Sequence, residues 1–126
     1  MQAFSSVSEK DILNEIRAID KVCKEPHDNI VRVLEHGRLP NSRYYYVDMV
    51  LCSLNLAQYL NGDYNAEIAS TLACSIKAID RQTNRKMRTV WYIMEQVTTG
   101  LQYIHSLDIT HRDLKPQNGA FSGGAC

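Results

Sequence analysis

The sequence lacks an excess of either charge, a long apolar run and a secretory leader. Lys and Arg together number 14, and Asp and Glu also number 14, in a chain of 126 residues. This balance gives no global field that would attract nucleic acid or a membrane surface. The first ten residues, MQAFSSVSEK, contain no apolar stretch of secretory length, and no run of 18 apolar residues occurs. We therefore expect an intracellular protein, cytoplasmic or nuclear, without a nucleic-acid or membrane partner.

Paired cysteines are also lacking. The four cysteines form no C-x-x-C motif; they are Cys23, Cys52, Cys74 and Cys126. A metal site on Cys23 and His27 would need a second pair of ligands, and none follows. Because we expect the protein to be intracellular, we also expect its thiols to be reduced. A hydrophobic content of 44% and a charged content of 22% are typical of a globular chain, long enough here for one domain with a core.

The first regular pattern predicts a helix that begins at a serine cap and ends before Pro26. Ser6 and Ser8 are both candidates for the cap, since each precedes an acidic residue by three positions. The apolar residues at helical spacing are Ile12, Ile16, Ile19 and Cys23. Glu15 lies within this apolar sector, so it either needs a partner or reaches solvent from the helix edge.

Two strands around a turn follow the helix. An apolar run at 30–34 and an aromatic, β-branched run at 43–51 flank the turn-rich segment GRLPNS at 37–42. This order predicts an antiparallel hairpin. The residues that share one face of the second strand are Tyr45, Val47, Met49 and Leu51.

The rest of the chain reads as mostly helical. A short helix is predicted from Leu54 to Leu60, ended by Asn61-Gly62, and another at 66–80. The segment 81–88 carries four positive charges and is either a docking patch or a solvated connector. A long helix is predicted from the apolar positions Met87, Val90, Met94, Val97, Leu101 and Ile104. The same spacing fits a coiled coil, but the heptads are too few and Gly100 interrupts them.

The stretch HRDLKPQN at 111–118 contains the residues best suited to catalysis. Asp113 is suited to orient a hydroxyl group, and Lys115 to neutralise a transferring phosphoryl group. The amide oxygen of Asn118 is a ligand for a hard metal ion, and Pro116 stiffens the loop that holds all three. A metal hydrolase built on His111 and Asp113 is an alternative, but no further ligand cluster accompanies that pair.

HRDLKPQN, directly after an amphipathic helix, resembles the catalytic loop of protein kinases, and its Lys-Pro portion is similar to the Ser/Thr type. The resemblance covers roughly residues 8–118. It implies a mostly helical α+β fold, a partial two-lobe kinase with the C-helix, the hairpin of the fourth and fifth strands, the D and E helices and the catalytic loop. Its implied parts are a small-lobe part at 8–51, a hinge at 50–53, a large-lobe part at 54–118 with a variable insertion at 61–86, and an unrelated tail at 119–126.

The resemblance also implies roles for single residues. Asp113 and Lys115 become catalytic, Asn118 a Mg²⁺ ligand, and His111 a scaffold residue packed beneath the loop. Arg112 would pair with a phosphorylated activation loop. Glu15 becomes the C-helix glutamate, Met49 the gatekeeper, and the Val50 carbonyl and Cys52 amide the partners of the adenine edge of ATP. The implied partner is a protein substrate.

Several motifs of the family have no counterpart in this sequence. No glycine precedes Ser8, Lys10 lies on the same predicted helix as Glu15, and no acidic residue follows Asn118. The Gly-rich loop, the strand lysine and the Asp-Phe-Gly motif are thus missing, and Phe121-Ser122-Gly123 does not replace the last of them. We expect this polypeptide alone not to phosphorylate proteins. A non-catalytic remnant that binds a partner through its C-helix or E-helix face is the alternative.

Overall fold

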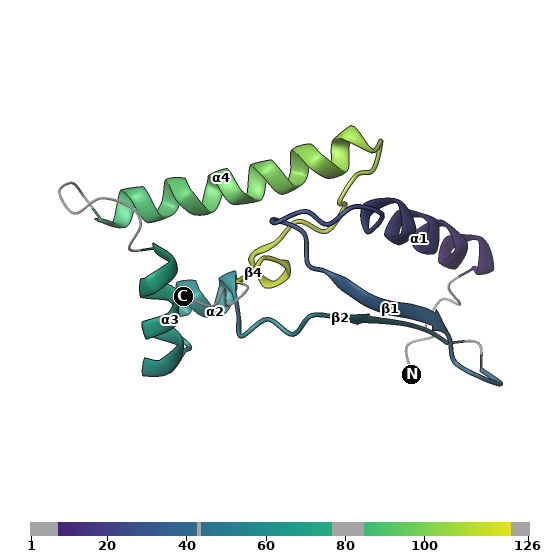
Figure 1. Ribbon diagram of the computed structural model, residues 1–126, viewed down its shortest axis with the longest axis horizontal. Helices are drawn as coiled ribbons and strands as arrows, with labels where there is room; N and C mark the ends of the chain where they lie inside the picture. The colour runs from purple at the N-terminus through teal and green to yellow at the C-terminus, as the bar shows by residue number, and fades with distance from the viewer. Residues whose placement is uncertain (1–7, 43, 77–84, 122–126) are drawn as a thin grey trace, which may run out of the picture.

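The computed structural model describes residues 8–42, 44–76 and 85–121, which form four helices, a 3-10 turn and four strands. In chain order they are α1 (Glu9–Val22), β1 (Val33–Arg38), β2 (Tyr45–Met49), β3 (Leu54–Asn55), α2 (Leu56–Asn61), α3 (Ala66–Ile76), α4 (Arg85–Ser106), η1 (Pro116–Asn118) and β4 (Ala120–Phe121). Helix α4 runs along one side of the molecule, with α1 and the β1–β2 hairpin toward one end and α2 and α3 at the other (Figure 1).

Helix α1 begins at Ser8, one of the two predicted caps; Ser6 lies outside the described residues. The Ser8 hydroxyl accepts a hydrogen bond from the Asp11 amide at 3.2 Å and donates one to the Asp11 carboxylate at 2.7 Å. The helix closes where the Cys23 amide donates to the Ile19 carbonyl at 2.8 Å. Its end at Val22, four residues before Pro26, agrees with the sequence expectation.

Strands β1 and β2 form the predicted antiparallel hairpin, with an irregularity between Val33 and Glu35. The predicted boundaries were wrong at three points: β1 begins at Val33 rather than at residue 30, Gly37 belongs to the strand rather than to the turn, and β2 spans Tyr45–Met49 rather than 43–51. Gly37 pairs with Tyr46, whose ring lies 3.2 Å from where a Cβ would stand. A glycine that reads as a turn residue therefore makes room for an aromatic ring.

Helix α2 is the predicted short helix after the second strand, but it begins at Leu56 rather than at Leu54, which belongs to β3. Asn55 caps it in a capping box with Gln58, and Gly62 ends it in the left-handed conformation with φ 74°. Strand β3 precedes it and pairs with β4, which brings Leu54 opposite Phe121. The sequence analysis did not predict this pairing, because it placed residues 119–126 outside the resemblance.

Helix α3 follows the prediction as far as Ile76; residues 77–80 of the predicted helix and 81–84 of the basic segment lie outside the described residues. Helix α4 confirms the predicted long helix. The apolar side chains of α4 differ in exposure along the helix. Ile104, near the C-terminal end, is buried, whereas Trp91, nearer the N-terminal end, is 69% exposed. The residues exposed beside Trp91 are Met87, Val90 and Met94. The described residues contain no helix long and apolar enough to cross a bilayer.

The described residues form little core. Among the described residues the buried hydrophobic side chains are Leu54, Leu72 and Ile104. The accessible surface is 10570 Å², against about 6,800 Å² for a compact protein of this mass by the usual scaling. Polar contacts between elements therefore carry much of the arrangement, and their residues can be named.

One set of these contacts joins the end of α1 and the following turn to α4. The Tyr103 ring of α4 stacks on His27 with centroids 4.5 Å apart. Its hydroxyl donates to the main-chain carbonyls of Val22, at 3.0 Å, and Glu25, at 3.3 Å. The Lys21 ammonium donates to the carbonyl of Leu107, just beyond α4. Helix α1 is thus held at its C-terminal end against the C-terminal end of α4.

The turn after α1 lies directly on α4. The Asn29 side chain donates to the Gln96 amide oxygen at 2.6 Å. A Cβ at Gly100 would lie 2.9 Å from the Asn29 carbonyl oxygen, closer than real Cβ contacts. Gly100, which the sequence analysis noted as an interruption of the heptads, thus permits the close approach of two main chains.

Candidate active site

The loop at 111–118 begins after a reversal at the end of α4. The amides of Leu107 and Ile109 both donate to the Ile104 carbonyl, at 3.2 and 3.1 Å, and Asp108 takes a φ of 58°. Asp108 is in the left-handed region that aspartate tolerates better than most residues. This reversal carries the chain away from the buried end of α4 and into the loop.

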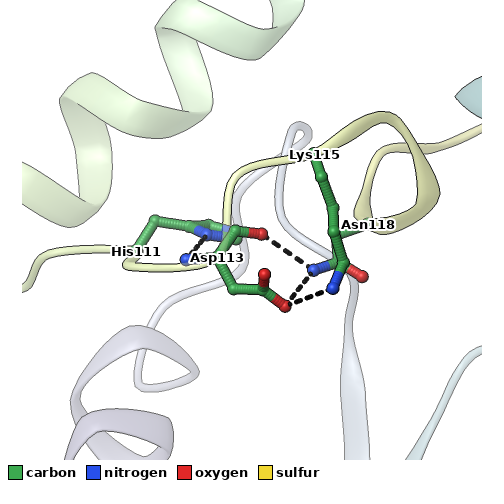
Figure 2. A network of polar contacts seen from close by, with 4 residues as sticks. All are labelled: His111, Asp113, Lys115 and Asn118. Carbon is green, nitrogen blue, oxygen red and sulfur yellow. Dashed lines mark hydrogen bonds and ion pairs between the residues drawn. The ribbon is translucent and has the colours of Figure 1, made fainter.

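Asp113, Lys115 and Asn118 meet in one polar network (Figure 2). The Lys115 ammonium lies 2.9 Å from an oxygen of the Asp113 carboxylate. The Asn118 side-chain amide donates to the same carboxylate oxygen and to the Asp113 carbonyl, both at 2.8 Å. The structure therefore brings together the two residues predicted as catalytic and the one predicted as a metal ligand.

The backbone of the loop is held by local hydrogen bonds. The Asp113 amide donates to the His111 carbonyl at 2.9 Å, and it also lies 3.3 Å from Nδ1 of His111. The Asn118 amide donates to the Lys115 carbonyl at 2.9 Å, and Pro116 opens the η1 turn between them. Proline has no amide hydrogen and a fixed φ, so it suits the first position of such a turn.

The expectation that His111 packs beneath the loop is corrected by the structure, because His111 is exposed. It supports the loop through its hydrogen bonds to Asp113. Arg112 is also exposed, with φ 63°, and it makes no ion pair within the described part of the chain. A positive φ is uncommon for such a side chain, and here it turns the backbone between His111 and Asp113.

The network sets the charge of Asp113. The hydrogen bond from Lys115 lowers the pKa of this carboxyl below its usual value, and the hydrogen bond from Asn118 lowers it further. The side chain is exposed, so solvent screens these interactions. Asp113 is consequently ionised at neutral pH and accepts hydrogen bonds there.

A support for the loop that the sequence analysis missed comes from Gly119. Its carbonyl accepts a hydrogen bond of 2.7 Å from the amide of Leu56, the first residue of α2. A Cβ at Gly119 would lie 3.5 Å from the Cβ of Leu56, an ordinary contact. Together with the β3–β4 pair, this bond anchors the end of the loop on α2. Only the position of Gly119 directly after the loop could have hinted at this.

Glu15 and Met49, which the resemblance assigns to the nucleotide side of the site, are not part of the network formed by Asp113, Lys115 and Asn118. Glu15 projects from α1, is exposed, and pairs with no cation among the described residues. Of the two possibilities left open above, the structure shows the solvent-facing one. Met49 ends β2 and is also exposed. In the described part of the chain, no hydrogen bond or ion pair joins either residue to Asp113, Lys115 or Asn118.

Two main-chain groups of the segment after β2 have no main-chain partner in the described ranges: the Val50 carbonyl and the Cys52 amide. The Val50 amide donates to the Arg32 carbonyl at 3.0 Å. The Val50 carbonyl accepts a hydrogen bond from the Cys52 thiol, whose sulfur is 3.9 Å away. The Val50 carbonyl and the Cys52 amide are the two groups that the family resemblance assigns to the adenine edge.

The residues of the loop suit a magnesium ion held jointly with phosphate. The Asn118 amide nitrogen is engaged by Asp113, which leaves its side-chain oxygen without a partner in the described structure. Within the same residues, no group of three or more His, Cys, Asp or Glu side chains gathers to hold a metal. Mg²⁺ commonly binds one or two protein oxygens and completes its shell with water and substrate phosphates. The donor chemistry therefore fits.

Comparisons with known proteins show which family the chain resembles. The family described as protein kinase domain matches residues 2–122. A serine/threonine-protein kinase/endoribonuclease IRE1b of Arabidopsis thaliana is 30% identical over 132 aligned residues, which covers 94% of this chain and 14% of the relative. Mitogen-activated protein kinase 14 of the same plant is 31% identical over 108 residues, which covers 86% of this chain and 26% of the relative.

The chain belongs to the protein kinase domain family. A rice relative, serine/threonine-protein kinase/endoribonuclease IRE1 of Oryza sativa subsp. japonica, is 27% identical over 118 residues, which covers 94% of this chain and 12% of the relative. The chain thus spans between about an eighth and a quarter of the length of these curated relatives. The helical content and small antiparallel sheets agree with a partial two-lobe kinase fold.

Proposed function

We propose that this chain carries the catalytic-loop portion of a serine/threonine protein kinase, which transfers the γ-phosphoryl group of ATP to a protein hydroxyl group. The observation that carries the proposal is the shared network of Asp113, Lys115 and Asn118. The Ser/Thr kinase names of the relatives support the type of hydroxyl. The proposal includes an intracellular site of action, in the cytoplasm or nucleus.

In this proposal Asp113 orients the substrate hydroxyl. Its lowered pKa makes it a weak base at neutral pH, and this suits a loose phosphoryl transition state, in which positioning matters more than early proton removal. The Lys115 ammonium pairs with the Asp113 carboxylate. In this proposal it therefore lies close to the substrate hydroxyl and to the phosphoryl group that the hydroxyl attacks. There it offsets negative charge on the transferring group.

Asn118 is the proposed magnesium ligand, through its free side-chain oxygen. When bound, the ion would offset the negative charge of the phosphates. The hydrogen bonds from the Asn118 nitrogen to Asp113 fix the direction of that oxygen. Asn118 therefore links the residue that orients the hydroxyl to the expected position of the phosphates.

The adenine edge would pair with the Val50 carbonyl and the Cys52 amide, with Met49 beside the ring. Support comes from their lack of main-chain partners in the described ranges. Glu15 would hold a lysine that aligns the phosphates, and the described residues offer it none. We therefore expect the chain by itself to be catalytically inactive.

The proposal is tested with the purified 126-residue chain and magnesium ATP. Amide resonances of Val50, Cys52 and Asn118 should shift on addition of the nucleotide, and GTP, whose base edge differs, should give a weaker response at Val50 and Cys52. No shift at any of these positions would contradict the nucleotide role. In the presence of radiolabelled ATP and a Ser/Thr peptide, transfer by the chain that is lost in Asp113→Asn would contradict the expected inactivity.

A second candidate function is a non-catalytic interaction module, favoured by the exposed apolar face of α4 around Trp91. Large exposed apolar patches mark surfaces that other chains cover. Expression of the chain, followed by sedimentation and thermal melting of any soluble protein, distinguishes the two functions. Soluble, monodisperse protein with a cooperative melting transition favours the module, whereas loss to inclusion bodies favours the kinase reading with an incomplete fold.

A further inference from the structure

His36 stands between two polar side chains from different elements. It lies on β1, and its Nε2 atom is 2.9 Å from a carboxylate oxygen of Asp20 on α1. Its Nδ1 atom is 2.6 Å from the hydroxyl oxygen of Tyr45, the first residue of β2. One imidazole ring therefore joins the helix to both strands of the hairpin.

The chemistry of the partners determines which nitrogen carries the proton. An ionised carboxylate can only accept, so Nε2 must donate to Asp20. In the neutral ring Nδ1 is then an acceptor, and Tyr45 donates its hydroxyl hydrogen to it. In the charged ring both nitrogens donate and the Tyr45 oxygen accepts instead. The ring thus keeps both contacts in either protonation state.

These contacts matter because the apolar face of α1 is only half-buried. None of the residues of α1 is buried. A second ion pair with the hairpin joins Glu9 to Arg38 at 3.3 Å, and these side chains are 77% and 58% exposed. The His36 side chain is only 24% exposed. Exposed pairs contribute little, whereas a partly buried ring with two partners loses less to solvent.

We propose that His36 is a positioning residue that latches α1 onto the hairpin through both ring nitrogens. Glu15 lies on the same helix as Asp20, and Tyr45 begins the strand that ends at Met49. The latch therefore couples the placement of Glu15 to the strand that leads into Val50–Cys52. This inference depends only on contacts within the chain, so it stands or fails apart from any nucleotide binding.

Amide hydrogen exchange along α1 tests the latch in the full chain. Asp20→Ala and Tyr45→Phe should each speed exchange at the α1 amides, and their joint effect should fall short of the product of the two by about threefold or more, because both act through one ring. In a His36→Gln background Tyr45→Phe should have no further effect. Glu9→Gln is the matched control and should change exchange by less than about twofold.

Nitrogen-15 spectra of the imidazole supply a readout that a general loss of packing would not produce. At alkaline pH the ring should carry its proton on Nε2, and Asp20→Ala should reduce that preference. Three outcomes would overturn the latch: a ring protonated mainly on Nδ1, effects of Asp20→Ala and Tyr45→Phe that simply multiply, or α1 amides that are unprotected in the parent chain.

Discussion

The catalytic loop and the nucleotide side of this chain differ in how far apart along the sequence their contacts lie. The bonds of the loop join residues two to five positions apart, such as Asp113 to Lys115 and Asp113 to Asn118. Glu15 and Met49 lie on separate elements, and neither has a polar partner in the described structure. The loop therefore forms its arrangement locally, whereas the nucleotide side depends on the packing of distant elements.

This difference explains why the loop is enough to identify the family but not enough for activity, which also needs the nucleotide side to be assembled. A local network needs only the correct order of residues and a stiff turn, which Pro116 supplies. A site shared by several elements needs a core to hold them, and the core found among the described residues is small. The four predictions that follow test this distinction between local and long-range arrangement.

The largest effect is expected from Gly100→Val. The new Cβ would lie 2.9 Å from the Asn29 carbonyl oxygen, so α4 must move away from the turn after α1. Overpacking of this kind costs about 1–3 kcal/mol, which urea unfolding followed by circular dichroism would measure. The loop should keep the low pKa of Asp113, because its bonds are local. Gln102→Val, at an exposed site of the same helix, is the control; an unchanged unfolding free energy for Gly100→Val would contradict the close approach.

Lys115→Met should raise the pKa of Asp113 toward the ordinary aspartate value of about 3.9, because the largest cause of its lowering is removed. The folded pKa lies below the unfolded one, so the stabilising contribution is present at neutral pH and is lost as the pH falls through the folded pKa. The variant should therefore lose less stability on acidification. Carbon-13 titration of the carboxyl group measures the change. Lys24→Met is the control, and an unaltered Asp113 titration in Lys115→Met would rule out the ion pair.

A smaller effect is expected from magnesium alone. Addition of MgCl₂ should shift the amide resonances of residues 113–118 other than Pro116 and leave those of α1 unchanged. The shifts should be small, because without phosphate the loop offers Mg²⁺ few oxygen ligands. Asn118→Ala should reduce the shifts, and Gln117→Ala, which removes a neighbouring exposed amide, should not. Equal responses in both variants would mean that Asn118 does not hold the ion.

The smallest effect is expected from Glu15→Gln. The side chain is exposed and without a cation in the described structure, so the free energy of unfolding should change by less than about 0.5 kcal/mol. Lys10→Gln, another charge removal on the same helix, serves as the comparison. A loss above about 1 kcal/mol in the free energy of unfolding, measured by urea unfolding, would show that Glu15 has a stabilising partner in the folded chain.

The sequence predicted those elements whose signals are local. Ser8 as a cap, the Asn61-Gly62 end of α2 and the periodicity of α4 are each written in a few neighbouring residues. The wrong boundaries of β1 have the opposite origin. Gly37 reads as a turn residue by composition, and only its pairing with Tyr46 across the hairpin places it in the strand.

The sequence by itself determined the family, the order of the longer helices and the hairpin, and the loop that contains Asp113, Lys115 and Asn118, because these depend on residues close together along the chain. The tertiary structure alone decided which faces are covered. It placed Gly100 against Asn29, stacked Tyr103 on His27, and put His36 between α1 and β2. Such contacts join positions that are distant in sequence, and no local pattern specifies them, because the free energy that selects them arises only when separate elements pack together.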